Sequence, residues 1–549
     1  MAPAGGGLSR GGTPRFGGHP GAFATLRARA PDLVVLGGLL LLAAILRLVD
    51  LPTRGTWDAD QGNDMLVLRA MVQDGIVPLL GPPTSIGDFH HGAMYYWLLA
   101  PAALVGRGDE PAQVVAAIAL GGTAAVGVTW WLARDIGGPI AGAAAGLLLA
   151  VSATAVSGST FLWNPNIVAL SGSLALAAAW LAWSRRRPGW WLAAAAATAV
   201  TMHGHVLGTT LLLPMAGLFL ADLRRRPAER RRLLGWGAAA LGCIAATYLP
   251  LLVHELGHDF EETRALVAWL TAGEGSDGGL GLAGRLVFIP LRIVAWPLVG
   301  AVLDAPVPAV AAVLLVGVLA AWRLRAGGQP ELDGVRWLAA VLVGCTLLLT
   351  VGAGGLATVT PLPVDHYHAF LDPAVVVIVG VGVAGLWRVG VADRAVADPA
   401  AADRVAAGGR VAAVAAVVTV VAIIAWNLAA LPPAIAPDGG WPAAQAAGDR
   451  LLARAAGRPI ALVGVPDFKP TTAYAYPLVR AGASPVAPST AEVVAVLCDD
   501  TFVQVVGAPC GGPAEEPALA AVGGSWRLID RFRPAPGRTL SVYERAGAA

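Results

Sequence analysis

Long apolar runs recur along almost the whole of this 549-residue chain and constrain its fold more than any other feature. Hydrophobic residues make up 56% of the sequence and charged residues only 13%, and the mean hydropathy is +0.65. Soluble domains carry about a quarter charged residues. The sequence therefore predicts a polytopic α-helical membrane protein. The net charge of +2 gives no indication of nucleic-acid binding, because the arginines lie in short clusters between the apolar runs.

Eleven apolar runs are predicted to cross the membrane. The first, 33–48, has no small-residue cleavage site after it and is followed by many further runs, so we expect a membrane helix and not a signal peptide. Several runs are shorter than the roughly 20 residues that a perpendicular helix needs. Arg292 and Pro297 interrupt a further run, 286–302, which we expect to be re-entrant or interfacial. The other ten spans lie near 112–133, 138–157, 163–183, 190–203, 205–221, 234–252, 307–323, 336–354, 372–389 and 410–429.

Arginine clusters set the predicted orientation. They lie in the loops between alternate spans, at 134, 185–187, 224–232, 323–325 and 388–404. With eleven spans and a cytoplasmic N-terminus, all of these clusters fall on the cytoplasmic side, as the positive-inside rule requires. A twelfth span at 286–302 would put the later clusters outside. The C-terminus is then extracytoplasmic, and the Gly-, Pro- and Arg-rich residues 1–31 are expected to be a disordered cytoplasmic tail. The Ala-, Gly- and Arg-rich composition is typical of a GC-rich bacterial genome, so we expect the bacterial inner membrane.

The polar loop, residues 57–97, follows the first span and holds five aspartates and two adjacent histidines. Acids beside a lipid-spanning segment are costly unless they meet water, a cation or a substrate. Tyr95, Tyr96 and Trp97 close the loop where the chain is expected to re-enter the bilayer interface. A solvated loop with an aromatic anchor is the alternative interpretation. The loop contains Asp58, Asp60, Asp64, Asp74, Asp88, His90 and His91.

Three features of this loop occur together: acids soon after the first membrane helix, the Leu80-Gly81-Pro82 run, and an H-x-x-x-YYWLLAP run that begins at His91. This combination resembles the GT-C superfamily of membrane glycosyltransferases. The nearest branch is glycosyltransferase family 39, which contains dolichyl-phosphate-mannose protein mannosyltransferases and the aminoarabinose transferases of lipid A. Trp163-Asn164-Pro165 also resembles this branch, although a helix start with proline in its first turn explains much of that run.

The resemblance implies a sugar donor carried on a polyprenyl phosphate, an extracytoplasmic acceptor (protein, lipid or glycan), and a loop acid that acts on the acceptor. Asp60-Gln61 falls where the family usually has Asp-Glu or Asp-Gln, and Asp64 follows one helical turn later. This sequence has Asp58-Ala59-Asp60 in place of a plain acidic pair. The choice between Asp58 and Asp60 as the catalytic base is therefore open, and we favour Asp60, with Asp64 as the third catalytic candidate.

Further polar residues are candidates for binding the donor phosphate or another part of the substrate. Arg47 ends the first span, where it either snorkels to the interface or places a cation near a lipid phosphate. The resemblance implies that the loop at 365–368 reaches the lipid-phosphate donor, whereas an interfacial anchor is the alternative. Histidine and tyrosine can both hydrogen-bond a phosphate. The full set of binding candidates is His90, His91, Tyr95, His366, Tyr367, His368, Arg47 and Glu255.

Eight of the nine histidines lie in pairs that map to the predicted outer side, and a zinc site is one interpretation of this. Only His254 and His258 have a helical H-x-x-x-H spacing. We therefore expect hydrogen bonding, no metal site and no cofactor, with a divalent cation as the alternative. Glu255 and Asp259 would share a helix face, which a solvated loop helix explains equally well.

The composition changes near Pro437, so residues 32–436 are predicted to form the membrane domain, with a catalytic loop at 50–95, and residues 437–549 a small extracytoplasmic α/β domain. Strands are expected at 458–466, 501–506 and 540–543. Cys498 and Cys510 are close enough in sequence to pair, and an extracytoplasmic location would allow a disulfide. Cys243 and Cys345 lie in apolar runs and are expected to be small core residues.

The predicted function is an inverting glycosyltransferase that moves a sugar from a polyprenyl-phosphate donor to an extracytoplasmic acceptor. A loop aspartate would act as the base, while His91, His366 and Arg47 would act as cations or hydrogen-bond donors to the departing phosphate. A membrane transporter or lipid flippase is the alternative. Transporters place ionisable residues or broken helices near the bilayer midplane, whereas here the mid-span residues are almost all apolar or small.

Overall fold

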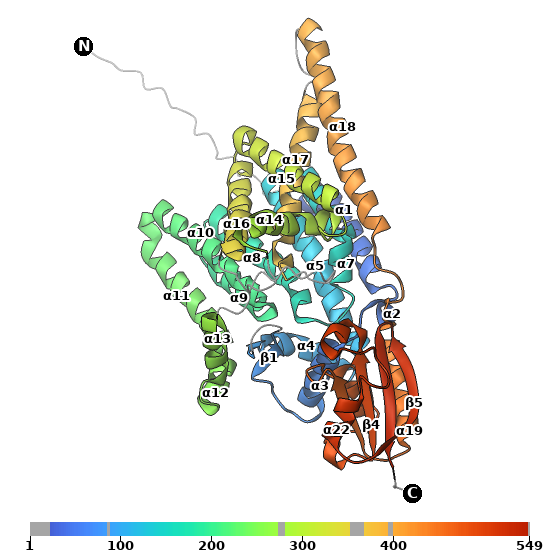
Figure 1. The fold of residues 1–549 in the computed structure, drawn as a ribbon. Helices are drawn as coiled ribbons and strands as arrows, with labels where there is room; N and C mark the ends of the chain where they lie inside the picture. The colour runs from blue at the N-terminus through green and yellow to red at the C-terminus, as the bar shows by residue number, and fades with distance from the viewer. Residues whose placement is uncertain (1–21, 85–87, 273–279, 352–366, 393–398, 547–549) are drawn as a thin grey trace, which may run out of the picture.

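The computed structural model describes residues 22–84, 88–272, 280–351, 367–392 and 399–546. Helices form a bundle, and a small sheet-containing domain packs against one end of it beside α3 and α4 (Figure 1). The helices of the bundle and of the polar loop are α1 (Ala22–Leu48), α2 (Leu51–Arg54), α3 (Ala59–Gln73), α4 (Met94–Val105), α5 (Pro111–Gly137), α6 (Pro139–Val151), α7 (Ala153–Ser157), α8 (Val168–Ser184), α9 (Trp190–Gly204), α10 (Leu212–Arg225), α11 (Arg230–Thr247), α12 (Leu249–Gly257), α13 (Glu261–Ala272), α14 (Leu282–Val299), α15 (Pro306–Ala326), α16 (Glu331–Val351), α17 (Asp372–Ala392) and α18 (Pro399–Ala429).

Nine helices in the described part of the chain are long and apolar enough to cross a membrane, and there are ten if α11 and α12, which meet at 46°, form one bent span. The polytopic helical fold is therefore confirmed. Ser152 divides the predicted span 138–157 into α6 and α7. Helix α9 matches the predicted run 190–203 and, with 15 residues, is shorter than a perpendicular span needs. Helix α14 meets the length and composition criteria, although we expected a re-entrant segment there. It continues through Pro290 and Pro297 while packing against α15, α16 and α17.

Helix α17 forms the centre of the bundle. It packs against α5, α6, α15, α16 and α18, and its residues from 374 to 382 are all buried. A helix that is apolar on every side is expected where no side meets water. Gly380 allows the close approach of α6, because a Cβ atom there would lie 2.6 Å from the carbonyl oxygen of Ala141.

The C-terminal domain, here residues 440–545, is built around one mixed sheet in the order β3-β4-β6-β5. β3 and β4 run parallel, whereas β6 pairs antiparallel with both β4 and β5. β4, with the sequence VVAVLCD, is buried along its whole length, as expected for the central strand of a covered sheet. The elements of this domain are α19 (Gly440–Ala455), β3 (Ile460–Val465), α20 (Thr472–Arg480), β4 (Val493–Asp499), α21 (Val503–Val506), α22 (Glu516–Val522), β5 (Trp526–Ala535) and β6 (Arg538–Arg545).

The predicted strands at 458–466 and 540–543 correspond to β3 and β6, but the predicted strand at 501–506 is wrong. This segment forms a helical turn and α21, because the side chain of Asp499 accepts a hydrogen bond from the backbone N–H of Thr501 (3.0 Å) and starts the turn. The second strand is β4, just before it. A disulfide joins Cys498, in β4, to Cys510, the pairing that an extracytoplasmic location would allow.

The C-terminal domain shares a hydrophobic core with the polar loop. Met65 and Leu68 of α3 pack in one buried cluster with Tyr474 and Leu478 of α20 and with inner residues of the sheet. A two-stranded ribbon, β1 (Leu80–Pro83) with β2 (His90–Gly92), completes the polar loop. The loop is therefore a folded layer between the bundle and the C-terminal domain.

Candidate active site

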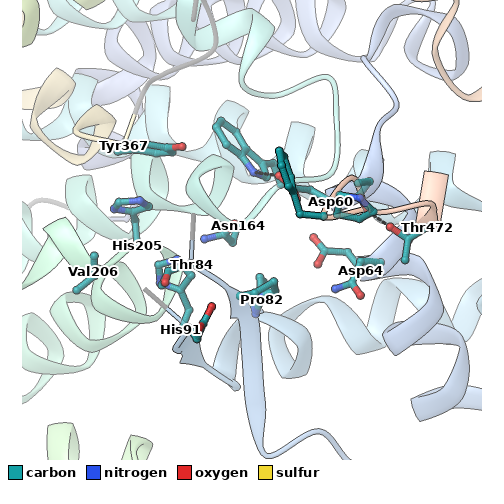
Figure 2. Close-up of a pocket in the computed structure, with 17 residues that line it drawn as sticks. Asp60, Asp64, Pro82, Thr84, His91, Asn164, His205, Val206, Tyr367 and Thr472 are labelled. Carbon is teal, nitrogen blue, oxygen red and sulfur yellow. Dashed lines mark hydrogen bonds between the residues drawn. The ribbon is translucent and has the colours of Figure 1, made fainter. Parts of the chain in front are cut away.

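A cavity of about 580 Å³ lies where the polar loop, the bundle and the C-terminal domain meet. Its lining includes three carboxylates and several aromatic rings. Figure 2 shows Tyr367, His205 and Val206 on one side and Asp60, Asp64 and Thr472 on the other. The lining includes Asp60 and Asp64 (α3), Pro82, Thr84, Asp88 and His91 (the β1–β2 ribbon), Trp163, Asn164, His205, Val206 and Tyr367 (the bundle), and Phe468, Pro470 and Thr472 (the C-terminal domain).

The start of α3 sets the direction of the acidic side chains. Asp58 is the N-cap residue, and Gln61 forms a capping box with it, since Gln61 Oε1 accepts from the backbone N–H of Asp58 at 2.8 Å. A Cβ atom at Gly62 would lie 2.2 Å from the carbonyl oxygen of Thr472, so only glycine allows α3 to approach the C-terminal domain this closely. The first turn of α3 is thus fixed by its cap and by a backbone contact.

Asp60 is exposed to the cavity from this first turn. Trp163 Nε1 donates a hydrogen bond to Asp60 Oδ2 at 3.0 Å. Burial in the cavity wall and the neighbouring Asp58 carboxylate raise the pKa of Asp60, while the Trp163 hydrogen bond and the Lys469 cation oppose this rise. A carboxylate with a raised pKa and an open face has the properties of a general base.

Asp64 lies one helical turn later and is buried. The hydroxyls of Tyr95 and Tyr96 donate to its two oxygens, at 2.7 and 2.8 Å. Burial raises the pKa of Asp64 to about 8, against the opposing effect of these two hydrogen bonds. Asp64 therefore tends to hold its proton near neutral pH. The hydroxyl of Tyr95, a predicted binding residue, therefore hydrogen-bonds Asp64 in this structure.

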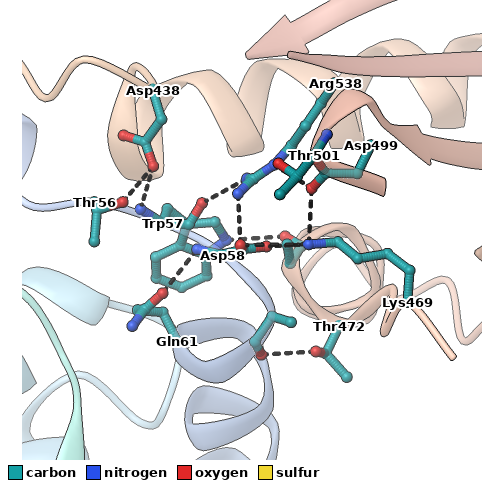
Figure 3. Close-up of polar contacts among 12 residues, drawn as sticks. Thr56, Trp57, Asp58, Gln61, Asp438, Lys469, Thr472, Asp499, Thr501 and Arg538 are labelled. Carbon is teal, nitrogen blue, oxygen red and sulfur yellow. Dashed lines mark hydrogen bonds and ion pairs between the residues drawn. The ribbon is translucent and has the colours of Figure 1, made fainter. Parts of the chain in front are cut away.

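Asp58 points towards Lys469 and Arg538 of the C-terminal domain (Figure 3). Its Oδ2 atom accepts a hydrogen bond from an Arg538 guanidinium nitrogen at 2.5 Å, and Lys469 Nζ lies 3.4 Å from both carboxylate oxygens. Asp58 thus contacts two cations, whereas Asp60 faces the cavity. This geometry favours Asp60 over Asp58 as a base.

Four rings form a continuous wall, the ring wall, which runs along the cavity from Trp163, beside Asp60, to His91. The His205 and Tyr367 rings stack with centroids 4.1 Å apart, His91 lies 5.2 Å from His205, and Trp163 lies 5.4 Å from Tyr367. Burial lowers the pKa of His91 to about 4, so its ring is neutral at pH 7 and supplies no cation. It can still donate one hydrogen bond. The close approach of Gly92 to His203 fixes this strand, since a Cβ atom there would lie 1.8 Å from His203 Nδ1.

The other binding candidates lie elsewhere. Arg47 is buried and donates to the carbonyl oxygens of Ala150 (3.0 Å) and Leu149 (3.1 Å), so it neither snorkels nor reaches the cavity. It instead satisfies backbone carbonyls that the end of α6 leaves unpaired. His90 pairs with Glu262, with its Nδ1 atom 2.8 Å from Glu262 Oε1.

Glu255 and His368 also fall outside the described lining of the cavity. Glu255 is buried in α12, where its Oε1 atom accepts from the backbone N–H of Thr263 at 3.0 Å. His368 is buried edge-on against Trp296, with ring centroids 5.8 Å apart. His366 lies outside the described residues.

One group in the described part of the chain has atoms close enough to hold a metal ion: His254, His258 and Glu261, whose ligand atoms lie within 4.8 Å of one another. These atoms already form hydrogen bonds, His254 Nε2 to Glu261 Oε1 and His258 Nδ1 to the His254 carbonyl oxygen, both at 2.9 Å.

Sequence reasoning missed three parts of this site. It counted His205 among the outer histidines but gave it no role, and it explained Trp163 mainly as part of a helix start. It also left open whether the C-terminal domain reaches the site, although Phe468, Pro470 and Thr472 line the cavity. The signal for Trp163 was the Trp-Asn-Pro run itself.

Comparisons with known proteins agree with this architecture. A family model described as dolichyl-phosphate-mannose-protein mannosyltransferase matches residues 90–254, which is under a third of the chain and begins after the three candidate aspartates. ArnT from Cupriavidus metallidurans, solved bound to undecaprenyl phosphate, is similar with a TM-score of 0.57 and 17% identity, over 94% of this chain and 98% of that one. This chain has the GT-C glycosyltransferase fold.

Other comparisons extend the GT-C likeness. The same ArnT in the apo state gives a TM-score of 0.56 and 16% identity, over 94% of this chain and 98% of that one. The archaeal oligosaccharyltransferase AglB from Archaeoglobus fulgidus, in complex with an inhibitory peptide and a dolichol-phosphate, gives 0.50 and 12% identity over 95% of this chain and 75% of that one. None of the curated proteins matches. The fold likeness therefore spans nearly the whole chain, including the C-terminal domain.

Proposed function

We propose that this protein transfers a sugar from a polyprenyl-phosphate donor to an acceptor at the outer face of a bacterial inner membrane, with Asp60 as the general base. The observation that carries the proposal is Asp60 itself, which faces an aromatic-lined cavity of about 580 Å³ at one end of a GT-C bundle. The undecaprenyl phosphate bound to ArnT and the dolichol-phosphate bound to AglB support a polyprenyl-phosphate donor.

The ring wall is the proposed sugar-binding surface, with the donor phosphate at its far end, by His205 and His91. Tyr367 and Trp163 offer flat apolar faces for one side of a sugar ring, which is how such pockets orient a ligand through a few aromatic and polar groups. The described lining contains no arginine or lysine, so hydrogen-bond donors such as His91 and His205 would receive the lipid phosphate. This replaces the cation that Arg47 was expected to supply.

In the proposed step, an acceptor oxygen or nitrogen attacks the anomeric carbon of the sugar from the Asp60 side. The bond from that carbon to the phosphate oxygen breaks, and the lipid phosphate leaves with the bonding electron pair on the side of His205 and His91. The proton of the nucleophile passes to Asp60. Because attack and departure occur on opposite faces, the anomeric configuration inverts. A base of this kind typically contributes about 10²–10⁴-fold to the rate.

The test is transfer by purified protein in liposomes, using radiolabelled polyprenyl-phosphate sugars as donors. We expect transfer by the wild type and a loss of about 10²–10⁴-fold in Asp60→Asn. Asp74→Asn is the matched control, because Asp74 is exposed at the other end of the same helix. Full transfer by Asp60→Asn would disprove the assignment. Label that crosses the bilayer without transfer would instead identify a transporter or flippase.

A further inference from the structure

Lys469 is the only lysine in the chain, and it lies at the contact between the C-terminal domain and the start of α3. Its Nζ atom lies 3.0 Å from Asp499 Oδ2 and 3.4 Å from both oxygens of Asp58. The side chain is 8% exposed. A buried ammonium between two carboxylates is held in place, since either carboxylate alone would leave it poorly compensated.

Arg538 reinforces the same contact from β6. One guanidinium nitrogen donates to Asp58 Oδ2 at 2.5 Å, a second donates to the Trp57 carbonyl oxygen at 3.2 Å, and Nε lies 3.5 Å from Asp499 Oδ2. Two cations of the C-terminal domain are thus shared between its own Asp499 and Asp58 of the polar loop (Figure 3). We call this group of four residues the ionic clamp.

Further hydrogen bonds continue the clamp along the residues just before Asp60. The Thr472 hydroxyl donates to the Ala59 carbonyl oxygen at 2.7 Å, and Trp57 Nε1 donates to the Ala473 carbonyl oxygen at 2.9 Å. Asp438 accepts from the backbone N–H of Trp57 at 2.9 Å. The C-terminal domain therefore holds the backbone immediately before Asp60, while Thr472 also lines the cavity that Asp60 faces.

We infer that Lys469 and Arg538 are positioning residues for Asp60, so that the C-terminal domain completes the active site by holding Asp58 and the first turn of α3. This inference rests on the proposed function of Asp60. Neither cation lines the cavity in the described part of the chain, so each positions Asp60 through Asp58, and Lys469 also acts on Asp60 through its charge. Misplacing a catalytic group by about 1 Å can cost about 10²-fold in rate, which makes such a clamp functionally important.

The clamp also sets the electrostatic environment of Asp60. Beyond burial, the Asp58 carboxylate raises the pKa of Asp60 and the Lys469 ammonium lowers it. Removing Lys469 should therefore raise the pKa of Asp60, and removing the Asp58 charge should lower it. A base is active when deprotonated, so the acidic limb of the rate profile follows this pKa. The other titratable groups around Asp60 are Asp64, Tyr95, Tyr96, Asp88, His91 and His205.

The experiment measures kcat and the pH profile of kcat/KM for full-length Lys469→Met, Lys469→Arg and Asp58→Asn. We expect kcat to fall about 10- to 100-fold in Lys469→Met, with its acidic limb at higher pH than in the wild type. Asp58→Asn should move the acidic limb to lower pH. Lys469→Arg keeps the charge and should keep the acidic limb of the wild type. Arg454→Met is the matched control, because Arg454 pairs with Asp530 on the surface of the same domain, 2.9 Å apart.

Opposite shifts in Lys469→Met and Asp58→Asn would support the clamp, since a purely structural role lowers the amount of active protein without moving the limb. Unshifted limbs and wild-type kcat in folded variants would overturn it. If Lys469→Met does not fold, the acidic limb of Asp58→Asn decides: a shift to lower pH supports the clamp, and an unshifted limb overturns it. A wild type that transfers no sugar from any donor would instead overturn the proposed function.

Discussion

Asp60 and Asp64 lie one helical turn apart, yet their surroundings give them different chemistry. Asp60 is open to the cavity with one hydrogen bond from Trp163. Asp64 is buried and receives two tyrosine hydroxyls. At the scale of single residues, the two aspartates thus divide the work: Asp60 is placed to accept a proton, while Asp64 anchors α4 to α3.

Asp64 gives a pH-dependent stability prediction. Its folded pKa, about 8, lies above its ordinary value of 3.8, so between these values the folded state binds a proton that the unfolded state has lost. Stability of the wild type should therefore fall as pH rises from about 4 to 8, by up to about 1.4 kcal/mol per pH unit. Asp64→Asn removes this dependence, because an amide stays neutral.

The measurement is the apparent unfolding temperature in detergent at pH 5 and pH 8. The unfolding temperature of Asp64→Asn relative to that of the wild type should be higher at pH 8 than at pH 5. For Asp74→Asn, at the exposed end of the helix, this difference should be the same at both pH values. Equal pH dependence in the wild type and Asp64→Asn would show that Asp64 is ionised throughout.

At the scale of elements, helix α3 depends on a contact that its own sequence does not explain. Gly62 would normally weaken a helix, because glycine costs about 1 kcal/mol relative to alanine in a helix interior. Here it lets α3 lie against the backbone of Thr472. The C-terminal domain therefore determines which residue α3 can tolerate in its first turns.

Gly62→Ala should destabilise the protein by about 1–3 kcal/mol, because the added methyl group meets a backbone oxygen that cannot move freely. The matched control is Gly217→Ala in α10, where an added Cβ meets nothing within 4 Å and should not destabilise. Thermal unfolding of both variants in detergent distinguishes the two sites. Equal stability of Gly62→Ala and the wild type would show that α3 can shift away from α20.

At the scale of the whole molecule, the sequence predicted the class of fold and the region of the site, but not the long-range contacts that complete them. Apolar runs and aspartates are local signals, so the helical bundle and the polar loop could be predicted. The path of α14 depends on its packing against α15, α16 and α17. At the break, Ser152 caps α7 locally, and the distant Asn427 accepts from the backbone N–H of Ala153. Strand β4 was missed although its VVAVLCD run is as continuously apolar as β3. The neighbouring TFVQVV is rich in strand-forming residues and was chosen in its place, but its first residues form a turn capped by Asp499.

The choice between Asp58 and Asp60 could not be made from sequence, because it depends on residues more than 400 positions away. Lys469 and Arg538 occupy Asp58, and this leaves Asp60 as the open carboxylate. The contacts of Arg47 could not be predicted for a similar reason. An arginine at the end of an apolar run gives no sign of the α6 carbonyl oxygens that it binds.

The most direct test of the account compares sugar transfer by Asp60→Asn and Asp58→Asn in the same preparation. The account predicts a loss of about 10²–10⁴-fold in Asp60→Asn, and measurable turnover in Asp58→Asn with its acidic limb at lower pH. Loss of transfer in Asp58→Asn together with wild-type turnover in Asp60→Asn would contradict it and would make Asp58 the base.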